Sequence, residues 1–258
     1  FDFSASKANG EDVQQIAAGD LTGDGRDDLI AATSSQSMYY TSNLSNWQSL
    51  TGRLEQITTG DLNGDGYDDL VGLTESGSIY YTLDLNTWQY LPGILNQITA
   101  GDFDGDGFDD IAGVTSSGQI FMTLDLNTWQ NIPGILAQVT AGDFDGDGTD
   151  DIVGVTSSGQ IFLTVDLTTW QNIPGALAQV TAGDFDGDGT DDIVRVTSSG
   201  QIFLTVDLTT WQVIPGILNQ VTAGDLNGDW LSDLAGLTDS GQIYYTLDLS
   251  NWSNIPAP

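Results

Sequence analysis

The sequence predicts an all-β fold, a six-bladed β-propeller in which each blade is a four-stranded antiparallel sheet. An acidic loop recurs at an unbroken period of 41 residues, opening at Asp20, Asp61, Asp102, Asp143, Asp184 and Asp225. A tryptophan recurs in phase with it, at Trp47, Trp88, Trp129, Trp170, Trp211 and Trp252. Two markers in phase indicate one structural unit repeated six times, and a period near 40 with glycine-rich turns is typical of propeller blades. We therefore expect one domain over residues 1–258, with blades at about 13–52, 54–93, 95–134, 136–175, 177–216 and 218–258.

Each unit contains four short β-prone segments. In the fourth copy these are 136–143, 150–156, 158–167 and 169–175, separated by Asp-Gly, Ser-Gly and Pro-Gly turn signals. No stretch shows the 3.6-residue apolar period of a helix. Four strands per unit match an antiparallel blade, and radial closure of such blades hides nearly all strand edges.

The acidic loop GDFDGDGFDD at 101–110 gathers carboxylates that repel one another, so a bound cation is expected to neutralise them. Alternate residues are aspartates, and the glycines permit the positive φ angles of a tight curl. This pattern predicts a calcium loop with donors from the side chains of Asp102, Asp104, Asp106 and Asp110 and from the carbonyl of Phe108. A metal-free, solvated acidic turn is the alternative, because Asp and Gly are common in turns.

The six copies show which loop positions matter. Positions one, five and nine are Asp in every copy, and position three always carries an oxygen donor. Position eight becomes Ser232 in the last copy, so Asp109 and its equivalents are expected to support the loop rather than bind the ion. With the carbonyl at position seven, the candidate ligands are Asp20, Thr22, Asp24, Arg26, Asp28, Asp61, Asn63, Asp65, Tyr67, Asp69, Asp102, Asp104, Asp106, Phe108, Asp110, Asp143, Asp145, Asp147, Thr149, Asp151, Asp184, Asp186, Asp188, Thr190, Asp192, Asp225, Asn227, Asp229, Leu231 and Asp233.

The six sites are not expected to be equal. Copies three to five offer four carboxylates each, whereas Thr22 and Asn63 replace one carboxylate in copies one and two. Copy six has Asn227 and also carries Trp230 where the curl favours glycine, so site six should be the weakest.

Composition excludes several functions. The formal net charge is −33, and the four basic residues form no run that could follow a phosphate backbone: Lys7, Arg26, Arg53 and Arg195. The chain has no apolar span or signal peptide, so we expect a soluble mature chain, or an excised part of one, without membrane insertion. Without His or Cys there is neither a zinc or copper site nor the commonest general base, so no enzyme is expected. Calcium sites of this kind fill readily outside cells, which favours an extracellular or cell-surface location.

The motif D-x-[DN]-x-D-G-x-x-D followed by a short apolar strand resembles the FG-GAP/VCBS repeats of integrin-α-like propellers, over residues 13–258. The resemblance implies calcium in the loop between the first two strands of each blade. The sequence is also similar to fungal integrin-like propeller lectins, and this similarity implies sugar binding in grooves between blades. Such propellers usually have seven blades, so either six blades close here or a seventh unit is missing. Residues 1–10, FDFSASKANG, lack both markers and are expected to add a strand beside 251–258.

Three functions remain open: a multivalent module binding glycans, a scaffold binding a cell-surface protein, and, least favoured, an enzyme. Copies four and five differ at only four positions, which indicates recent amplification or design of the array and near-identical, multivalent pockets. The repeated tryptophan fills the space between blades or stacks on sugars. The expected sugar-binding wall places Trp129, Gln130 and Asn131 of one blade opposite Gln160 and Thr164 of the next.

Arg195 breaks the repeat, because the other blades have Gly or Ala at its position. A buried, unpaired arginine is costly, so its head is expected to reach solvent, the central channel or a carboxylate. It is either a tolerated or engineered variation or a ligand contact present in one blade alone.

Overall fold

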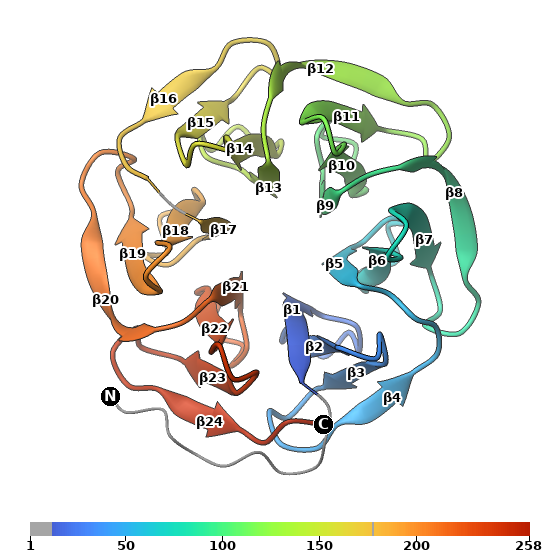
Figure 1. Ribbon diagram of the computed structural model, residues 1–258, viewed down its shortest axis with the longest axis vertical. Helices are drawn as coiled ribbons and strands as arrows, with labels where there is room; N and C mark the ends of the chain where they lie inside the picture. The colour runs from blue at the N-terminus through green and yellow to red at the C-terminus, as the bar shows by residue number, and fades with distance from the viewer. Residues whose placement is uncertain (1–11, 177) are drawn as a thin grey trace.

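The structure is a computed structural model that describes residues 12–176 and 178–258. Within these residues, 24 strands form six four-stranded antiparallel sheets arranged around a central axis (Figure 1). In every sheet the spatial order of the strands is their order in the sequence. The predicted six-bladed propeller of four-stranded blades is therefore confirmed. Among the described residues there is no helix, and hence none with the length and hydrophobicity to cross a bilayer.

The strands of the six blades, in chain order, are β1 (Val13–Gly19), β2 (Asp28–Thr33), β3 (Met38–Thr41), β4 (Gln48–Leu50); β5 (Gln56–Gly60), β6 (Asp69–Leu73), β7 (Ser78–Thr82), β8 (Gln89–Ile94); β9 (Gln97–Gly101), β10 (Asp110–Val114), β11 (Gln119–Thr123), β12 (Gln130–Ile135); β13 (Gln138–Gly142), β14 (Asp151–Val155), β15 (Ile161–Thr164), β16 (Gln171–Ile173); β17 (Gln179–Gly183), β18 (Asp192–Val196), β19 (Gln201–Thr205), β20 (Gln212–Ile217); β21 (Gln220–Gly224), β22 (Asp233–Leu237), β23 (Ile243–Thr246) and β24 (Ser253–Ile255). The four segments predicted in the fourth copy contain β13, β14, β15 and β16.

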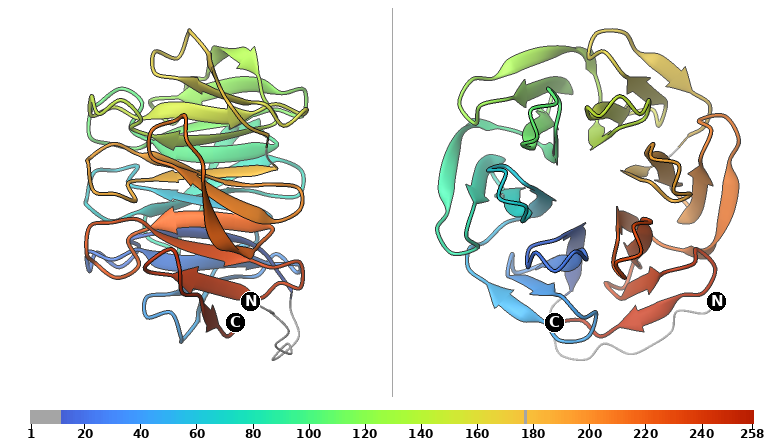
Figure 2. Two further views of the ribbon diagram at one scale, coloured as in Figure 1. Left: turned by 90° about the vertical axis from the view of Figure 1, so that its left-hand side faces the viewer. Right: turned by 180° about the vertical axis from the view of Figure 1, so that it is seen from behind.

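The ring closes with six blades. Each innermost strand contacts the innermost strands of both neighbours, and β1 contacts β21. Figures 1 and 2 show the first blade beside the last. The backbone N–H of Asp27 donates to the carbonyl of Asp225 across this junction, at 2.8 Å. Six-bladed closure is thus the correct alternative, and no seventh unit is needed. The strand expected from residues 1–10 lies outside the described residues.

Glutamines at the start of the innermost strands join neighbouring blades. The Gln97 amide donates to the carbonyl of Val139 at 2.9 Å and accepts from its N–H at 2.8 Å. Gln179 makes the same pair of bonds with Val221. Each amide therefore continues the β-ladder from one sheet to the next. The polar side chains of these strands also line the central channel.

The core lies between the blades. The second strand of each blade is almost entirely buried, because neighbouring blades cover both of its faces. In the cluster between the third and fourth blades, Ile120 packs with Ile152 and with Phe103, which is only 7% exposed. Phe103 is the second residue of an acidic loop, so this apolar side chain anchors the loop to the core.

Candidate cation-binding loops and inter-blade pockets

Each acidic loop joins the first and second strands of its blade and curls around its first aspartate. In the third blade, Asp102 Oδ1 accepts from the N–H groups of Gly105 at 2.8 Å and Asp106 at 3.1 Å. Its Oδ2 accepts from the N–H of Gly107 at 2.9 Å. Gly105 and Gly107 have φ angles of 74° and 86°, which only glycine adopts without strain. The predicted curl is therefore present.

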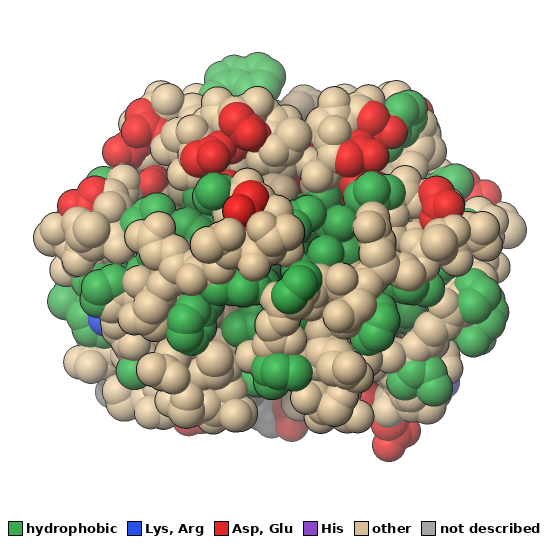
Figure 3. All heavy atoms as spheres, turned by 90° about the horizontal axis from the view of Figure 1, so that it is seen from above, with side chains coloured by type: hydrophobic (Ala, Val, Ile, Leu, Met, Phe, Trp, Pro, Cys, Tyr) green, Lys and Arg blue, Asp and Glu red, His purple; other side chains and the backbone are tan. Residues whose placement is uncertain are grey.

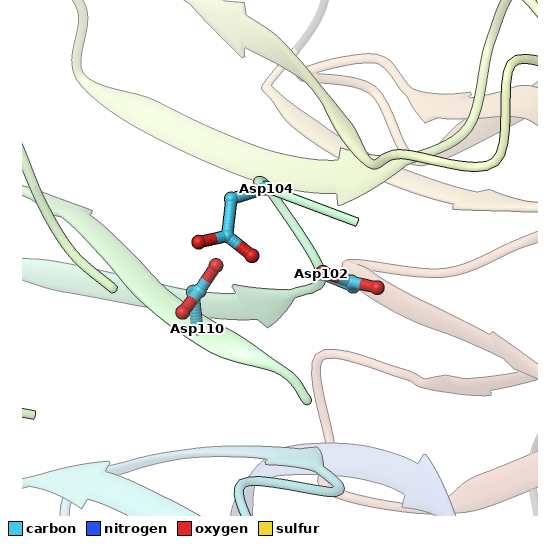
Figure 4. Close-up of side chains that lie close together, drawn as sticks. All are labelled: Asp102, Asp104 and Asp110. Carbon is cyan, nitrogen blue, oxygen red and sulfur yellow. The ribbon is translucent and has the colours of Figure 1, made fainter. Parts of the chain in front are cut away.

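Three loops bring carboxylates together. In the third blade, one oxygen each of Asp102, Asp104 and Asp110 lie within 4.8 Å of one another, and the carboxylates of Asp104 and Asp110 face each other (Figure 4). Burial, followed by the charges of neighbouring aspartates, raises the pKa of Asp110 to about 7. The equivalent groups in the fourth and fifth blades are Asp143, Asp145, Asp151 and Asp184, Asp186, Asp192. An all-oxygen, anionic donor set fits a hard cation such as calcium.

Asp106, at position five, does not belong to this group of three. Its Oδ1 accepts from the N–H of Phe108 at 3.0 Å, which holds the loop's last turn. The structure therefore brings together three of the four predicted carboxylates of this loop.

The other three loops replace a carboxylate with a hydrogen-bond donor. Asn63 donates through Nδ2 to both oxygens of Asp69, at 3.2 and 3.0 Å. Asn227 does the same to Asp233, at 3.4 and 3.1 Å. These contacts partly compensate the buried carboxylate at position nine without a metal. To offer its oxygen to a cation, each asparagine amide would have to turn over.

The last loop keeps its curl despite Trp230. This residue has a φ of 71°, in the region that favours glycine, and its N–H donates to Asp225 Oδ2 at 2.8 Å. The indole is 86% exposed, so packing of this side chain does not offset the backbone strain. Strain, rather than a lost hydrogen bond, distinguishes this loop.

We expect calcium to fill the loops in two groups. Loops three to five should bind first, because no side-chain N–H group of the loop compensates their facing carboxylates, as Asn63 and Asn227 do in loops two and six. Asp104→Asn should move the third loop into the weaker group, and Glu75→Gln, which removes an exposed charge outside the loops, is the matched control. Calcium titration by calorimetry should lose one tight site in the first variant and none in the second. Equal affinity at all six loops would contradict the expectation.

The aspartate at position eight joins one loop to the next. Asp150 Oδ2 accepts from the N–H of Asp102 at 2.9 Å, and the Asp150 N–H donates to the Asp102 carbonyl at 2.7 Å. Burial raises the pKa of Asp150 to about 7, and the charge of Asp191 in the next blade adds to this. The same linkage recurs around the ring through Asp27, Asp68, Asp109 and Asp191, and Ser232 keeps the backbone bond.

Pockets lie between blades on the outer side of the ring. One, of about 260 Å³, is lined by Ile79, Gly93, Ile94, Leu95, Thr115, Phe121 and Trp129. The next, of about 300 Å³, is lined by Gly134, Ile135, Leu136, Thr156, Gln160, Phe162 and Trp170. In each, a tryptophan and a phenylalanine from one blade meet the Pro-Gly-Ile end of the preceding blade's last strand. We call this pair of rings the aromatic corner.

The tryptophans fill the space between blades, which is one of the two roles that the sequence left open. Each is half-buried, and Trp170 packs against the core cluster of its junction. Its Nε1–H donates to the carbonyl of Pro133 in the preceding blade at 2.5 Å, and Trp129 makes the same bond to Pro92 at 2.7 Å. The remaining indole surface lines the pocket. Each tryptophan thus joins two blades, and Trp129 and Trp170 also line pockets.

The sequence predicted Trp129 opposite Gln160 of the next blade, but these two residues line different pockets. Gln160 does line a pocket, but beside Trp170 of its own blade, because each tryptophan reaches back rather than forward. Trp129 lines the preceding pocket. Thr164 is buried, and its hydroxyl donates to Asp166 at 3.2 Å. Sequence reasoning also missed Phe121 and Phe162, whose alternation along the third strand was the available signal.

This geometry defines the class of the protein: a closed repeat propeller with aromatic pockets at its blade junctions. The chain belongs to the Tectonin domain family, whose description matches residues 12–146 and 105–257. No curated protein matches the sequence.

Solved structures share the fold at low identity. A triple arginine-to-alanine mutant of AofleA from Arthrobotrys oligospora has a TM-score of 0.67 and 9% identity, over 95% of this chain and 87% of that one. SapL1 lectin in complex with alpha methyl fucoside has a TM-score of 0.62 and 12% identity, over 95% and 97%. BBS1N in complex with ARL6DN has a TM-score of 0.60 and 12% identity, over 100% of this chain and 84% of that one.

Proposed function

We propose that this protein is a multivalent carbohydrate-binding module whose sugar sites are the inter-blade pockets. The observation that carries the proposal is the repeated aromatic corner. An indole face suits the C–H face of a pyranose, and a few polar groups at the rim suit its hydroxyls. In the pocket of Trp170 those groups are the side chains of Thr156 and Gln160. A fucoside-bound lectin of the same fold supports the choice of ligand class.

Calcium belongs to the proposal as a structural ion. The residues that would hold it are the loop aspartates at positions one, three and nine, such as Asp102, Asp104 and Asp110. A bound cation would neutralise facing carboxylates and fix loops that also link neighbouring blades. It lies in a different part of each blade from the aromatic corner, so we assign it no direct contact with sugar. A calcium-dependent fold suits an extracellular or cell-surface protein.

The proposal is tested with a glycan array, followed by calorimetric titration of a glycan that binds. Several weak, equivalent sites per chain are expected, with strong avidity on a surface. Trp129→Ala with Trp170→Ala should remove two sites. Gln160→Ala, a milder change that spares the core, should weaken one site, whereas Gln130→Ala, exposed and outside both pockets, should change none.

Binding that is insensitive to Gln160→Ala and to the double tryptophan variant would contradict the pocket assignment. Absence of glycan binding, together with capture of a defined protein partner, would favour the scaffold. That alternative is supported by exposed apolar side chains, among them Ile94, Ile135 and Val213. Figure 3 shows apolar side chains spread across one side of the ring. BBS1N, in complex with ARL6DN, is an example of this fold with a protein partner.

A further inference from the structure

The junction between the fourth and fifth blades differs from the others at two neighbouring positions. Arg195 lies in β18, where the equivalent residue of the preceding blade is Gly154. Ala176 stands where the preceding junction has Ile135, a residue that lines the pocket there. One change adds a long cationic side chain, and the other removes an apolar side chain from the pocket mouth.

Arg195 occupies the aromatic corner of its own junction. Its guanidinium carbon lies 4.0 Å from the centroid of the Trp211 ring and 4.7 Å from that of Phe203. By the 41-residue period these rings are the equivalents of Trp170 and Phe162, which line the pocket one junction earlier. Arg195 is only half-buried, but it neither lines the central channel nor meets a carboxylate among the described residues. Two aromatic faces receive it instead.

The guanidinium lies against the backbone that forms the pocket floor. A Cβ built on Gly175 would meet Arg195 Nη1 at 2.0 Å, whereas one on the equivalent Gly134 would meet the indole of Trp170 at 3.1 Å. Nε and Nη1 of Arg195 are buried and have no hydrogen-bond partner among the described residues. Ring faces, not hydrogen bonds, therefore hold this cation in place.

Arginine suits such a corner better than lysine does. Its planar guanidinium stacks on aromatic faces and is more weakly hydrated than an ammonium group. The chain carries a formal charge of −33, so its field attracts cationic ligands to every junction. The pockets at Trp129 and Trp170 have the same two rings but no arginine of their own.

We propose that the aromatic corners at the blade junctions are binding sites for arginine side chains. Arg195 is the built-in occupant of the corner between the fourth and fifth blades. The corners formed by Trp129 with Phe121 and by Trp170 with Phe162 are open to arginines of a basic partner peptide. This goes beyond sugar binding, because the ligand is a planar cation on a flexible arm.

The test exchanges occupied and open corners. The probe is acetylated tri-arginine amide, with tri-lysine amide of equal charge as its control, titrated into the calcium-saturated protein near physiological salt. Arg195→Gly copies the residue found at 154, so it should fold and add one tri-arginine site. Gly154→Arg with Ile135→Ala reproduces the occupied junction and should remove one. Intrinsic tryptophan fluorescence and calorimetric stoichiometry are the measurements, and melting curves verify folding.

The number of tri-arginine sites is expected to rise by one in Arg195→Gly and to fall by one in Gly154→Arg with Ile135→Ala. The binding of tri-lysine should not change in either variant. The proposal is overturned if both peptides bind alike, or if Arg195→Gly leaves the stoichiometry unchanged. Absence of tri-arginine binding also overturns it. Any of these outcomes leaves the glycan result standing on its own.

Discussion

The melting temperature is expected to rise markedly when chelator is replaced by millimolar calcium. In the metal-free protein, Asp104 and Asp110 face one another with no cation between them, and the same arrangement recurs in two further blades. A ligand that binds only the native state stabilises it by about 2.7 kcal/mol per site when its concentration is about 100 times Kd. Three such sites at that concentration would together add about 8 kcal/mol, which is comparable with the net stability of a domain, about 5–15 kcal/mol.

Differential scanning calorimetry in chelator, calcium and magnesium measures this effect. Magnesium is the control for ionic strength and for nonspecific charge neutralisation, and it should stabilise less because it demands a smaller, octahedral site. A variant with Asp104→Asn, Asp145→Asn and Asp186→Asn should lose most of the calcium effect. An unchanged melt between chelator and calcium would refute the assignment of these loops to calcium.

In chelator, the unfolding free energy is expected to fall as the pH rises from about 5 to about 8. Burial first, and then neighbouring aspartates, raises the pKa of Asp27 and of Asp109 to about 7. The pKa values of Asp68 and Asp191 are raised to about 6, again chiefly by burial. The folded state therefore binds protons more tightly than the unfolded chain does. This stabilisation is complete below the ordinary aspartate pKa and is lost as the pH passes through the raised values.

Exposed aspartates whose pKa is lowered do not reverse this trend. The pKa of the exposed Asp84 is lowered to about 2 by backbone hydrogen bonds, so it is already ionised above about pH 5. Asp150→Asn keeps an oxygen for the Asp102 N–H but cannot ionise, so it should raise the metal-free melting temperature near pH 8 and flatten the pH dependence. Glu75→Gln, which also removes one charge, should leave the slope unchanged. A metal-free melt that is flat or rises with pH would show that the inter-blade carboxyls do not govern stability.

The repeat predicts most of the fold because its signals are local. The 41-residue period, the turn dipeptides and the curl around Asp102 each depend on a few adjacent residues, and all are present in the structure. Contacts between blades could not be predicted in the same way. The pairing of Gln97 with Val139, or the direction in which Trp170 reaches, depends on how two sheets are rotated against each other. One sequence contains no record of that rotation.

Arg195 illustrates the same limit for the site. The sequence shows that the residue is exceptional, and elementary electrostatics requires its charge to be compensated. Which compensation it receives depends on two rings that lie 8 and 16 residues further along the chain, at Phe203 and Trp211. Equivalent rings at the other junctions are visible in the repeat, with Phe121 and Phe162 or the tyrosines Tyr39, Tyr80 and Tyr244 in place of Phe203, but only their shared position in space makes them a corner.

The ring closes without a shared strand. Among the described residues, the first blade is built entirely from β1 to β4 and the last entirely from β21 to β24, with Asp27–Asp225 and Trp47–Pro256 contacts between them. The tryptophan bond and the backbone bond between acidic loops also recur at every other junction of the described blades. The covalent order of the blades is therefore arbitrary with respect to the folded ring. A circular permutant that starts at any blade boundary, with the present ends joined by a flexible linker, should fold to the same propeller.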